Sequence, residues 1–396
     1  MNSTALNCLR SQRGLTLVEL MVAIAIAMVV VLAATNVLVV GEAHKRTTSS
    51  TNDANQSGSF AAYALDRALR SAGSGYAQAW DQGAFGCKLS ASRVIGGSAT
   101  TILPRTAAFP APFADFLASA PGTLALAPLL IGNNMSEGGS DVLVVMGGNG
   151  SAGDVARPIR SSASGGIRLD NTVGMKSGDM GLVTQPGATD CLLQQVSVTD
   201  ADAFKAVGND VLPIGGEFAN TSNLGAFADS GTATYSVLGN VAAGNVQFQM
   251  FGVDANRTLV SYDLLRAAAT GANADPIQPI ADGVLEMHAI YGIDSSAPHD
   301  NKVDSWVAPS GDWALDKVLA SPQLMRQIVA VRVALVMRSS AYEKNDVTLA
   351  RPALFSDTAV SIPAVDYAAG VENRHFRLRV IDTTIPLRNM LLLPTS

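Results

Sequence analysis

Hydrophobic positions are most concentrated near the N-terminus of the chain. Every residue from Leu20 to Ala34 is apolar, and the apolar run extends from Leu15 to Val40. Its polar interruptions are Thr16, Glu19, Thr35 and Asn36. An α-helix of this length spans roughly 39 Å, which is enough to cross a lipid bilayer. The pattern therefore predicts a membrane-spanning helix near the start of the chain.

Residues 41–59 are polar, and their Ser, Thr and Asn content is also compatible with a linker. They contain no proline, however, and the next segment has an apolar stripe at helical spacing. The stripe consists of Phe60, Ala64, Leu65, Ala68 and Leu69, with Gly73 as a candidate C-cap. We therefore expect one helix from about Leu15 to Ala72, within a helical segment 15–74. We expect its middle to be loosened and its second half to pack on the globular body.

Beyond Gly75, short apolar runs alternate with Gly, Pro, Ser and Asn, which predicts a β-rich body. The predicted strands are 141–147, 192–198, 245–251, 257–265, 283–293, 327–339 and 374–389. In 327–339, alternate apolar residues from Val329 to Met337 face away from Arg332 and Arg338, as in a half-buried antiparallel strand. We therefore expect an α+β protein with a β-rich, mainly antiparallel head at 75–396. Residues 90–245 are a candidate separate insert within this head.

Composition and motifs argue against several classes of function. The 396 residues include 27 Lys and Arg and 33 Asp and Glu, giving a net charge of -6. Without a basic run, nucleic-acid binding has no electrostatic support. The chain contains no G-x-S-x-G, H-E-x-x-H or P-loop motif, and the glycine-rich stretch 147–153 leads toward Pro158 rather than into a helix. We expect no enzymatic activity, no cofactor and no small-molecule substrate.

The residues at the start of the apolar run resemble a known signal. Arg10 and Arg13 precede the run and no acidic residue does, so the positive-inside rule places the N-terminus in the cytoplasm. The stretch "RGLTLVELMVAIAI" resembles the signal of type IV prepilins and pseudopilins. That signal combines a short charged leader, a glycine before the cut, a hydrophobic first residue, a second-position Thr and a fifth-position Glu.

This resemblance implies that residues 1–14 are a leader peptide. A prepilin peptidase would cut after Gly14 and methylate the new N-terminus at Leu15. Leu15 departs from the Phe of most major pilins and is more typical of minor components. Glu19 becomes the fifth mature residue.

A carboxylate in a membrane helix is costly and marks a candidate functional residue. In an assembled filament, Glu19 would pair with the free amine of a neighbouring subunit and set the axial register. Its position alone is also compatible with a carboxylate that extends to the membrane interface.

Three late segments resemble a narrower family. "VLEMHAIYGID", "VAVRVALVMRS" and "FRLRVIDTTIPLRN" look like recurring blocks of the PilW-type minor pilins. The resemblance covers the N-terminal signal and much of 280–390, whereas 90–245 does not align. It implies a minor pilin that primes or caps type IV pilus assembly in a tip complex, with other minor pilins and the major pilin as partners. Pilus biogenesis, twitching motility and adhesion would depend on it.

The same resemblance implies a location. The chain would be a single-pass inner-membrane protein with its head in the periplasm, and would enter the extracellular pilus after assembly.

Three other interpretations stay open. A pseudopilin of a type II secretion system uses the same signal and helix. A tip adhesin would use the head, and 90–245 above all, to bind a surface. A signal-anchored periplasmic protein would not be cut at Gly14 and would tolerate Glu19→Ala.

Cysteines and acidic residues suggest two further sites. Cys8 lies in the leader, which leaves Cys87 and Cys191 in the part predicted to leave the cytoplasm. A pair in an oxidising compartment predicts a disulfide, with two buried free thiols as the alternative. Two cysteines and scattered histidines do not support a zinc site. Oxygen ligands that calcium prefers lie close together at Asp294, Asp300, Asn301 and Asp304. The EF-hand glycine is absent, so we favour a solvated hairpin loop there.

Overall fold

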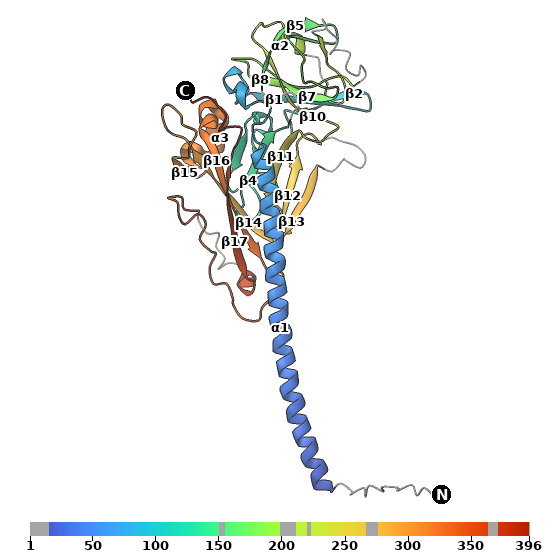
Figure 1. The fold of residues 1–396 in the computed structure, drawn as a ribbon, viewed down its shortest axis with the longest axis vertical. Coiled ribbons are helices and arrows are strands. Elements are labelled where there is room, and N and C mark those ends of the chain that lie inside the picture. The colour runs from blue at the N-terminus through green and yellow to red at the C-terminus, as the bar shows by residue number, and fades with distance from the viewer. Residues whose placement is uncertain are drawn as a thin grey trace, which may run out of the picture. The chain divides into compact units, whose positions relative to one another are not determined.

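The computed structural model describes residues 16–149, 155–198, 211–219, 223–266, 276–362 and 371–395. The chain divides into two compact units, Met1–Asn52 and Asp53–Ser396. The second unit contains the β-rich body, which confirms the predicted α+β class (Figure 1).

The N-terminal helix α1 runs without interruption from Leu17 to Arg70 (Figure 1). The prediction that the middle of this helix is loosened is therefore wrong, because 41–59 is helical throughout. This stretch lacks proline, and its hydroxyl side chains can hydrogen-bond to carbonyls one turn back. Thr51 Oγ1 donates to Thr47 O at 2.9 Å. Such bonds let Ser and Thr remain inside a helix despite their preference for caps and turns.

In the second unit, α1 buries one narrow face. Ala61, Leu65, Ala68 and Leu69 are each at most 6% exposed. Their spacing matches the period of a helix that packs along one side. Phe60 was expected in this stripe but lies 56% exposed, so that part of the prediction is wrong.

The described residues of the body form three sheets. The eight-stranded sheet has the order β2 (Ser98–Leu103), β1 (Lys88–Ile95), β8 (Asp190–Gln195), β7 (Asp179–Thr184), β10 (Thr234–Asn240), β5 (Arg157–Ala163), β6 (Gly166–Leu169), β9 (Val211–Pro213). The five-stranded sheet has the order β13 (Ile277–Asp282), β12 (Thr258–Asp263), β11 (Gln247–Val253), β4 (Val142–Gly147), β3 (Leu129–Gly132). The four-stranded sheet has the order β15 (Ser305–Val307), β14 (Val284–Ile293), β16 (Ile328–Arg338), β17 (Leu378–Pro386).

Short helical segments connect the strands. They are η1 (Ala77–Gln82), η2 (Pro121–Thr123), η3 (Glu137–Gly139), α2 (Leu224–Ala228), η6 (Gly311–Trp313), α3 (Leu315–Ala320), α4 (Pro322–Gln327) and η7 (Val371–His375). Among the strands that the structure describes, pairing is antiparallel except between β1 and β8, which pair in parallel. The mainly antiparallel head is thus confirmed.

The candidate insert at 90–245 is divided between two sheets. Most of its strands form the eight-stranded sheet, but β3 and β4 belong to the five-stranded sheet. There β4 pairs with β11, for example Val144 with Met250. The segment 129–147 is therefore part of the central core, and 90–245 cannot be removed as one block without opening that core.

The helix approaches the four-stranded sheet closely at Gly58. A Cβ at this position would overlap the Ile381 side chain of β17 and would lie 2.7 Å from Met337 Cγ of β16. We expect Gly58→Leu to lower the free energy of unfolding by about 1–3 kcal/mol, because the larger side chain overpacks this contact. Thermal unfolding of the head measures the loss. Gly41→Leu is the control, since nothing lies within 4 Å of its Cβ on the same helix. Equal midpoints for the two variants would contradict the close contact.

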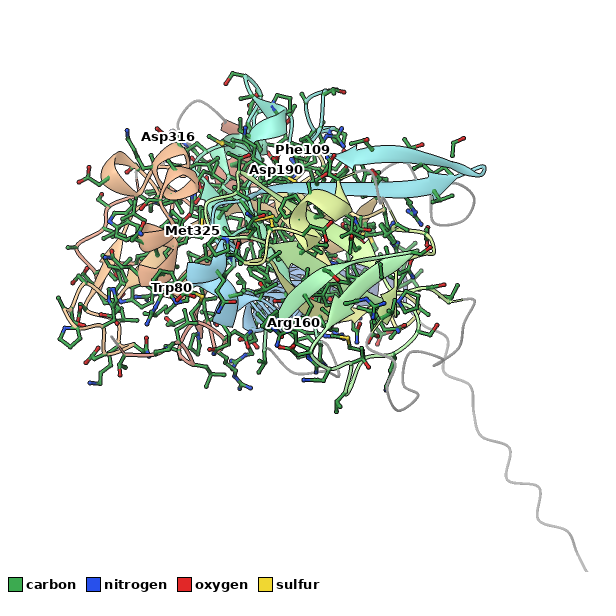
Figure 2. All side chains as sticks on the ribbon, turned by 90° about the horizontal axis from the view of Figure 1, so that it is seen from above. Trp80, Phe109, Arg160, Asp190, Asp316 and Met325 are labelled. Atoms are coloured by element: carbon green, nitrogen blue, oxygen red, sulfur yellow. A yellow bond between two sulfur atoms is a disulfide. The ribbon has the colours of Figure 1, made fainter. Side chains whose placement is uncertain are left out.

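A disulfide joins Cys87 and Cys191, whose Cα atoms lie 5.7 Å apart. Cys87 directly precedes β1, and Cys191 follows Asp190 at the start of β8 (Figure 2, where Asp190 is labelled). The bridge thus lies at the parallel pair of strands, where Leu89 is the register partner of Cys191. It links positions 104 residues apart in the chain.

Loss of this bridge is expected to destabilise the head. Replacing Cys87 and Cys191 together by serine should lower the free energy of unfolding by about 2–4 kcal/mol, because the unfolded chain regains the entropy of an open loop. Urea unfolding of the full chain, with its leader retained, measures the change. Cys8→Ser should have no effect, and a double variant as stable as the wild type would contradict the expectation.

Strand β16 is buried on both faces, so the predicted half-buried strand is wrong. Val331, Val333 and Leu335 contribute to the main core, as expected. On the opposite face, Ala334 and Val336 pack with Leu354 and Phe355 in a separate cluster. The covering residues come from 339–362, the first described part of the connection between β16 and β17, which we call the strap.

The strap also covers Arg332, which was expected on a solvated strand face. Its side chain is only 15% exposed and forms ion pairs with Asp357 of the strap and Asp382 of β17, both at 2.7 Å. Its guanidinium also lies 5.6 Å from the centre of the Phe355 ring. A cation over an aromatic face is attracted by the ring quadrupole. The alternating arginine of β16 is therefore a structural anchor for the strap.

Four buried charged side chains connect the strap to β14 and to the start of β4. Arg351 Nη1 donates to Glu286 Oε2 at 2.8 Å, and both side chains are 3% exposed. His288 Nε2 lies 3.2 Å from the same Glu286 oxygen. His288 Nδ1 lies 3.6 Å from Asp141 Oδ1, an ion-pair distance that is too long for a hydrogen bond. Asp141 Oδ2 accepts the Ala289 backbone N–H at 2.8 Å.

This cluster predicts a stability that depends on pH. Burial lowers the pKa of His288, but Asp141 and Glu286 raise it more, to about 9. Because this value lies above the ordinary 6.5, His288 contributes stability that is fully present below about pH 6.5 and is lost as pH rises through about 9. Between those pH values, the wild type should lose more stability than His288→Gln. Urea unfolding at several pH values measures the difference, with exposed His44→Gln as the control. Equal pH slopes for wild type and His288→Gln would contradict the assignment.

Candidate functional site

The start of α1 is fixed by a reciprocal set of hydrogen bonds between Thr16 and Glu19. The Glu19 backbone N–H donates to Thr16 Oγ1 at 3.3 Å. In return, Glu19 Oε2 accepts from the Thr16 backbone N–H and from Thr16 Oγ1, each at 3.0 Å. This is the geometry of a capping box, in which the N-cap and the third helical residue satisfy each other's free donors. The second and fifth residues of the expected mature chain thus cap the helix together.

These bonds engage only one oxygen of the Glu19 carboxylate. Among the residues that the structure describes, Oε1 has no hydrogen-bond partner. A carboxylate can accept about four hydrogen bonds, so the capping box leaves Glu19 able to bind a further cation. Local capping and pairing with a second molecule are therefore compatible at this residue.

The apolar half of α1 offers a continuous hydrophobic surface. Its large hydrophobic residues from Leu17 to Val40 are 48–74% exposed. Within the described residues, α1 is long and apolar enough to cross a membrane. A helix that is apolar on all sides is typical of a membrane span or of a helix buried among others. The predicted processing site falls outside this view, because Gly14, Leu15 and Cys8 lie outside the described residues.

The acidic loop after β14 uses its carboxylates internally. Asp294 Oδ1 accepts from the Ser296 hydroxyl at 2.5 Å and from the Ser296 backbone N–H at 3.1 Å. Asp304 Oδ2 accepts from the backbone N–H and hydroxyl of Ser295. Asn301 accepts from Arg326, a buried cation. Within the described parts of the chain, no group of three or more His, Cys, Asp or Glu has the arrangement of a metal site.

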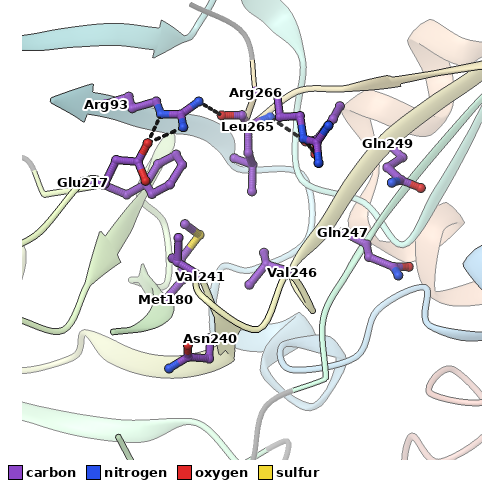
Figure 3. A pocket seen from close by; sticks show the side chains of 13 residues that line it. Arg93, Met180, Glu217, Asn240, Val241, Val246, Gln247, Gln249, Leu265 and Arg266 are labelled. Carbon is purple, nitrogen blue, oxygen red and sulfur yellow. Dashed lines mark hydrogen bonds and ion pairs between the residues drawn. The ribbon is translucent and has the colours of Figure 1, made fainter. Parts of the chain in front are cut away.

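A hollow of about 300 Å³ lies where the eight-stranded and five-stranded sheets adjoin. Figure 3 shows Gln247 and Gln249 of β11 on one side, and Arg93 with Glu217 on the other. Its remaining lining residues are Met180, Phe218, Asn240, Val241, Gly244, Val246, Asp263, Leu265 and Arg266.

The charged residues of the hollow are arranged in pairs. Arg93 forms an ion pair with Glu217 and also donates from Nη1 to Leu265 O at 3.2 Å. Arg266 Nε lies 3.5 Å from Asp263 Oδ2. Burial raises the pKa of the Asp263 carboxyl, while the backbone N–H of Leu265 and the charge of Arg266 oppose that shift. The two arginines are therefore matched by two carboxyl groups, and the lining of the hollow has no excess of positive or negative charge.

Sequence reasoning did not identify this hollow. A partial signal exists in the stretch "NVQFQMF", where Gln247 and Gln249 alternate with Phe248 and Met250. Alternation along a strand places both glutamines on one face. What the sequence lacks is any indication that β1, β7 and the 241–246 turn lie opposite that face.

Comparison with known proteins gives two matches. Residues 250–389 match the family model described as Type IV Pilus-assembly protein W. Residues 9–35 match the Prokaryotic N-terminal methylation motif, which includes Gly14, Leu15 and the Thr16–Glu19 capping box. No curated protein matches the chain, and no solved structure does.

Proposed function

Because this chain is a PilW-type type IV pilus protein, we propose that it acts as a minor pilin that primes or caps pilus assembly. In this proposal the subunit is stored in the inner membrane through α1, with its head in the periplasm. A prepilin peptidase removes residues 1–14, and the mature chain then enters a tip complex with other minor pilins and the major pilin. Its role is structural and requires no catalysis.

The observation that carries the proposal is the start of α1. An exposed apolar helix begins directly after a capping box whose carboxylate keeps one oxygen uncommitted. The free amine that cleavage would create at Leu15 is the complementary charge. When a charge pair is removed from water, the loss of one partner leaves a buried charge uncompensated and is strongly destabilising. Such a pair therefore favours the one register of subunits in which both charges meet.

The match at 250–389 supports a pilus rather than a secretion system. It spans the whole four-stranded sheet and the strap, and also β12, β13 and the end of β11 in the five-stranded sheet. In the proposal, the four-stranded sheet and the second half of α1 contact the neighbouring subunits. Pilus biogenesis, twitching motility and adhesion would follow from assembly.

Deletion of the gene tests this function. We expect the deletion strain to produce few or no surface pili, and expression of the intact chain to restore them. The subunit should also be detectable by immunoblot in pili sheared from complemented cells. Normal piliation in the deletion strain, together with absence of the chain from sheared pili, would refute the proposed role.

A further inference from the structure

The hollow between β11 and the strands β1, β7 and β10 of the eight-stranded sheet is a candidate ligand site. Its volume of about 300 Å³ lies at the lower end of the range for small-molecule sites. Such sites combine apolar surface with placed polar groups. This hollow has five apolar lining residues beside seven polar or charged ones, so it suits a polar ligand with one nonpolar face. It lies in the head, so it is independent of the assembly role of α1.

The apolar part of the lining comes from Met180, Phe218 and Leu265, which are buried, and from Val241 and Val246, which are partly exposed. Figure 3 shows the two valines between the glutamine side and the arginine side. Partly exposed aliphatic side chains at this position give a ligand a nonpolar face to pack against. Burying that surface contributes to affinity in proportion to its area.

The polar part offers hydrogen bonds without net charge. Gln249 makes no side-chain hydrogen bond to any residue within the described ranges. Gln247 uses its Oε1 to accept from the Ser71 hydroxyl at 2.9 Å, which leaves its amide N–H groups available. The amide of Asn240, by contrast, bonds to Ser177 O and Asp179 and is structural. An amide can both donate and accept, which suits a ligand whose groups do the same.

From this arrangement we propose that the hollow binds a neutral saccharide. The hydroxyl groups of the sugar would bond to Gln247 and Gln249, and its C–H face would pack on Val241 and Val246. The paired charges argue against phosphates, other anions and cations, because Arg93 already binds Glu217 and Arg266 lies beside Asp263. A single compact ligand also fits the volume better than an extended peptide does.

Saturation-transfer NMR on the full chain in lipid nanodiscs tests the proposal. The probes are the methyl glycosides of glucose, galactose, mannose and N-acetylglucosamine, together with lactose and maltose. Sialic acid serves as the charged comparison, and a pool of neutral pentapeptides as the alternative class. We expect at least one neutral sugar to bind, with little change in affinity between about 50 mM and about 500 mM salt, because screening acts on charges.

Gln249→Leu should weaken that binding by about 3- to 10-fold, which corresponds to the loss of one or two hydrogen bonds. The matched control is Gln323→Leu on α4, an exposed glutamine outside the hollow, which should bind as the wild type does. Unchanged thermal midpoints confirm folding, and Gln249→Asn replaces Gln249→Leu if the latter does not fold. The proposal is overturned if no neutral sugar binds, if only sialic acid or peptides bind, or if neither Gln249 variant weakens binding.

Discussion

Replacing Glu19 by glutamine is expected to remove most of this subunit from assembled pili while leaving cleavage after Gly14 intact. Glutamine at this position still accepts the Thr16 backbone N–H, so the capping box survives. The charge that would pair with a neighbour's N-terminal amine is lost. Breaking a buried, hydrogen-bonded charge pair costs enough to lower incorporation at least about tenfold. Quantitative immunoblots of sheared pili against whole cells measure the effect.

Thr16→Val is the matched comparison, because it keeps the charge and removes the hydroxyl that caps the helix. Loss of such an N-cap costs about 1 kcal/mol, so incorporation should fall only several-fold. If Thr16→Val were the more severe variant, capping rather than charge pairing would be the main role of Glu19. If both variants assembled normally, the pilin account of this helix start would be wrong.

Replacing Arg351 by methionine is expected to cause the largest loss of stability in the head. Its guanidinium is buried against Glu286, and His288 lies beside the same carboxylate. Removing one partner of a buried ion pair leaves an uncompensated charge, which costs about 3–5 kcal/mol. Urea unfolding of the full chain measures the loss. Arg388→Met, at an exposed position, is the control and should stay within about 0.5 kcal/mol of the wild type.

The double variant Arg351→Met with Glu286→Met tests whether the two side chains interact with each other. Two apolar side chains in place of a buried pair are often tolerated, so the double variant should recover part of the stability that Arg351→Met loses. If the double variant instead lost as much stability as the two single variants together, Arg351 of the strap and Glu286 of β14 would not interact. Such a result would contradict the role of this cluster in holding 339–362 against β14.

Much of the fold was predictable where the signal is local. The apolar run from Leu20 to Ala34 predicts the exposed half of α1, because a helix that is apolar on every side and longer than most core helices is typical of a membrane span. The seven predicted strands correspond to β4, β8, β11, β12, β14, β16 and β17. Each contains a short run of apolar residues, and β4, β14, β16 and β17 are also rich in β-branched residues. Strands such as β2 were missed, since "SATTIL" has exposed polar residues and no buried alternation over most of its length.

The remainder depends on segments that are distant in the chain. The second face of β16 is buried because the strap packs over it. The sequence of 328–338 gives no signal that another segment covers this face. His288 is an isolated histidine in the sequence, yet it lies beside Asp141, which is distant in the chain, and beside Glu286, which pairs with the equally distant Arg351. The same holds for the hollow, where Gln249 of β11 faces Arg93 of β1.

The candidate site at the start of α1 was partly predictable, because its residues are close together in the chain. Thr16 and Glu19 are three residues apart, so the spacing already permits a capping box. From the sequence, Glu19 was expected to pair with the amine of a neighbouring subunit, with extension to the membrane interface as the alternative, and the structure adds its bonds to Thr16. The division of 90–245 between two sheets also limits deletion experiments. Deleting the whole segment would remove β3 and β4 from the five-stranded sheet.

The most direct test of the account is the intact mass of the protein purified from membranes of cells with and without prepilin peptidase. The account predicts that the peptidase-positive cells contain a chain lacking residues 1–14 and carrying one added methyl group at Leu15. The peptidase-negative cells should retain the full chain from Met1. An unprocessed Met1 terminus in both strains would contradict the pilin account and would leave a membrane-anchored, β-rich protein with a different role.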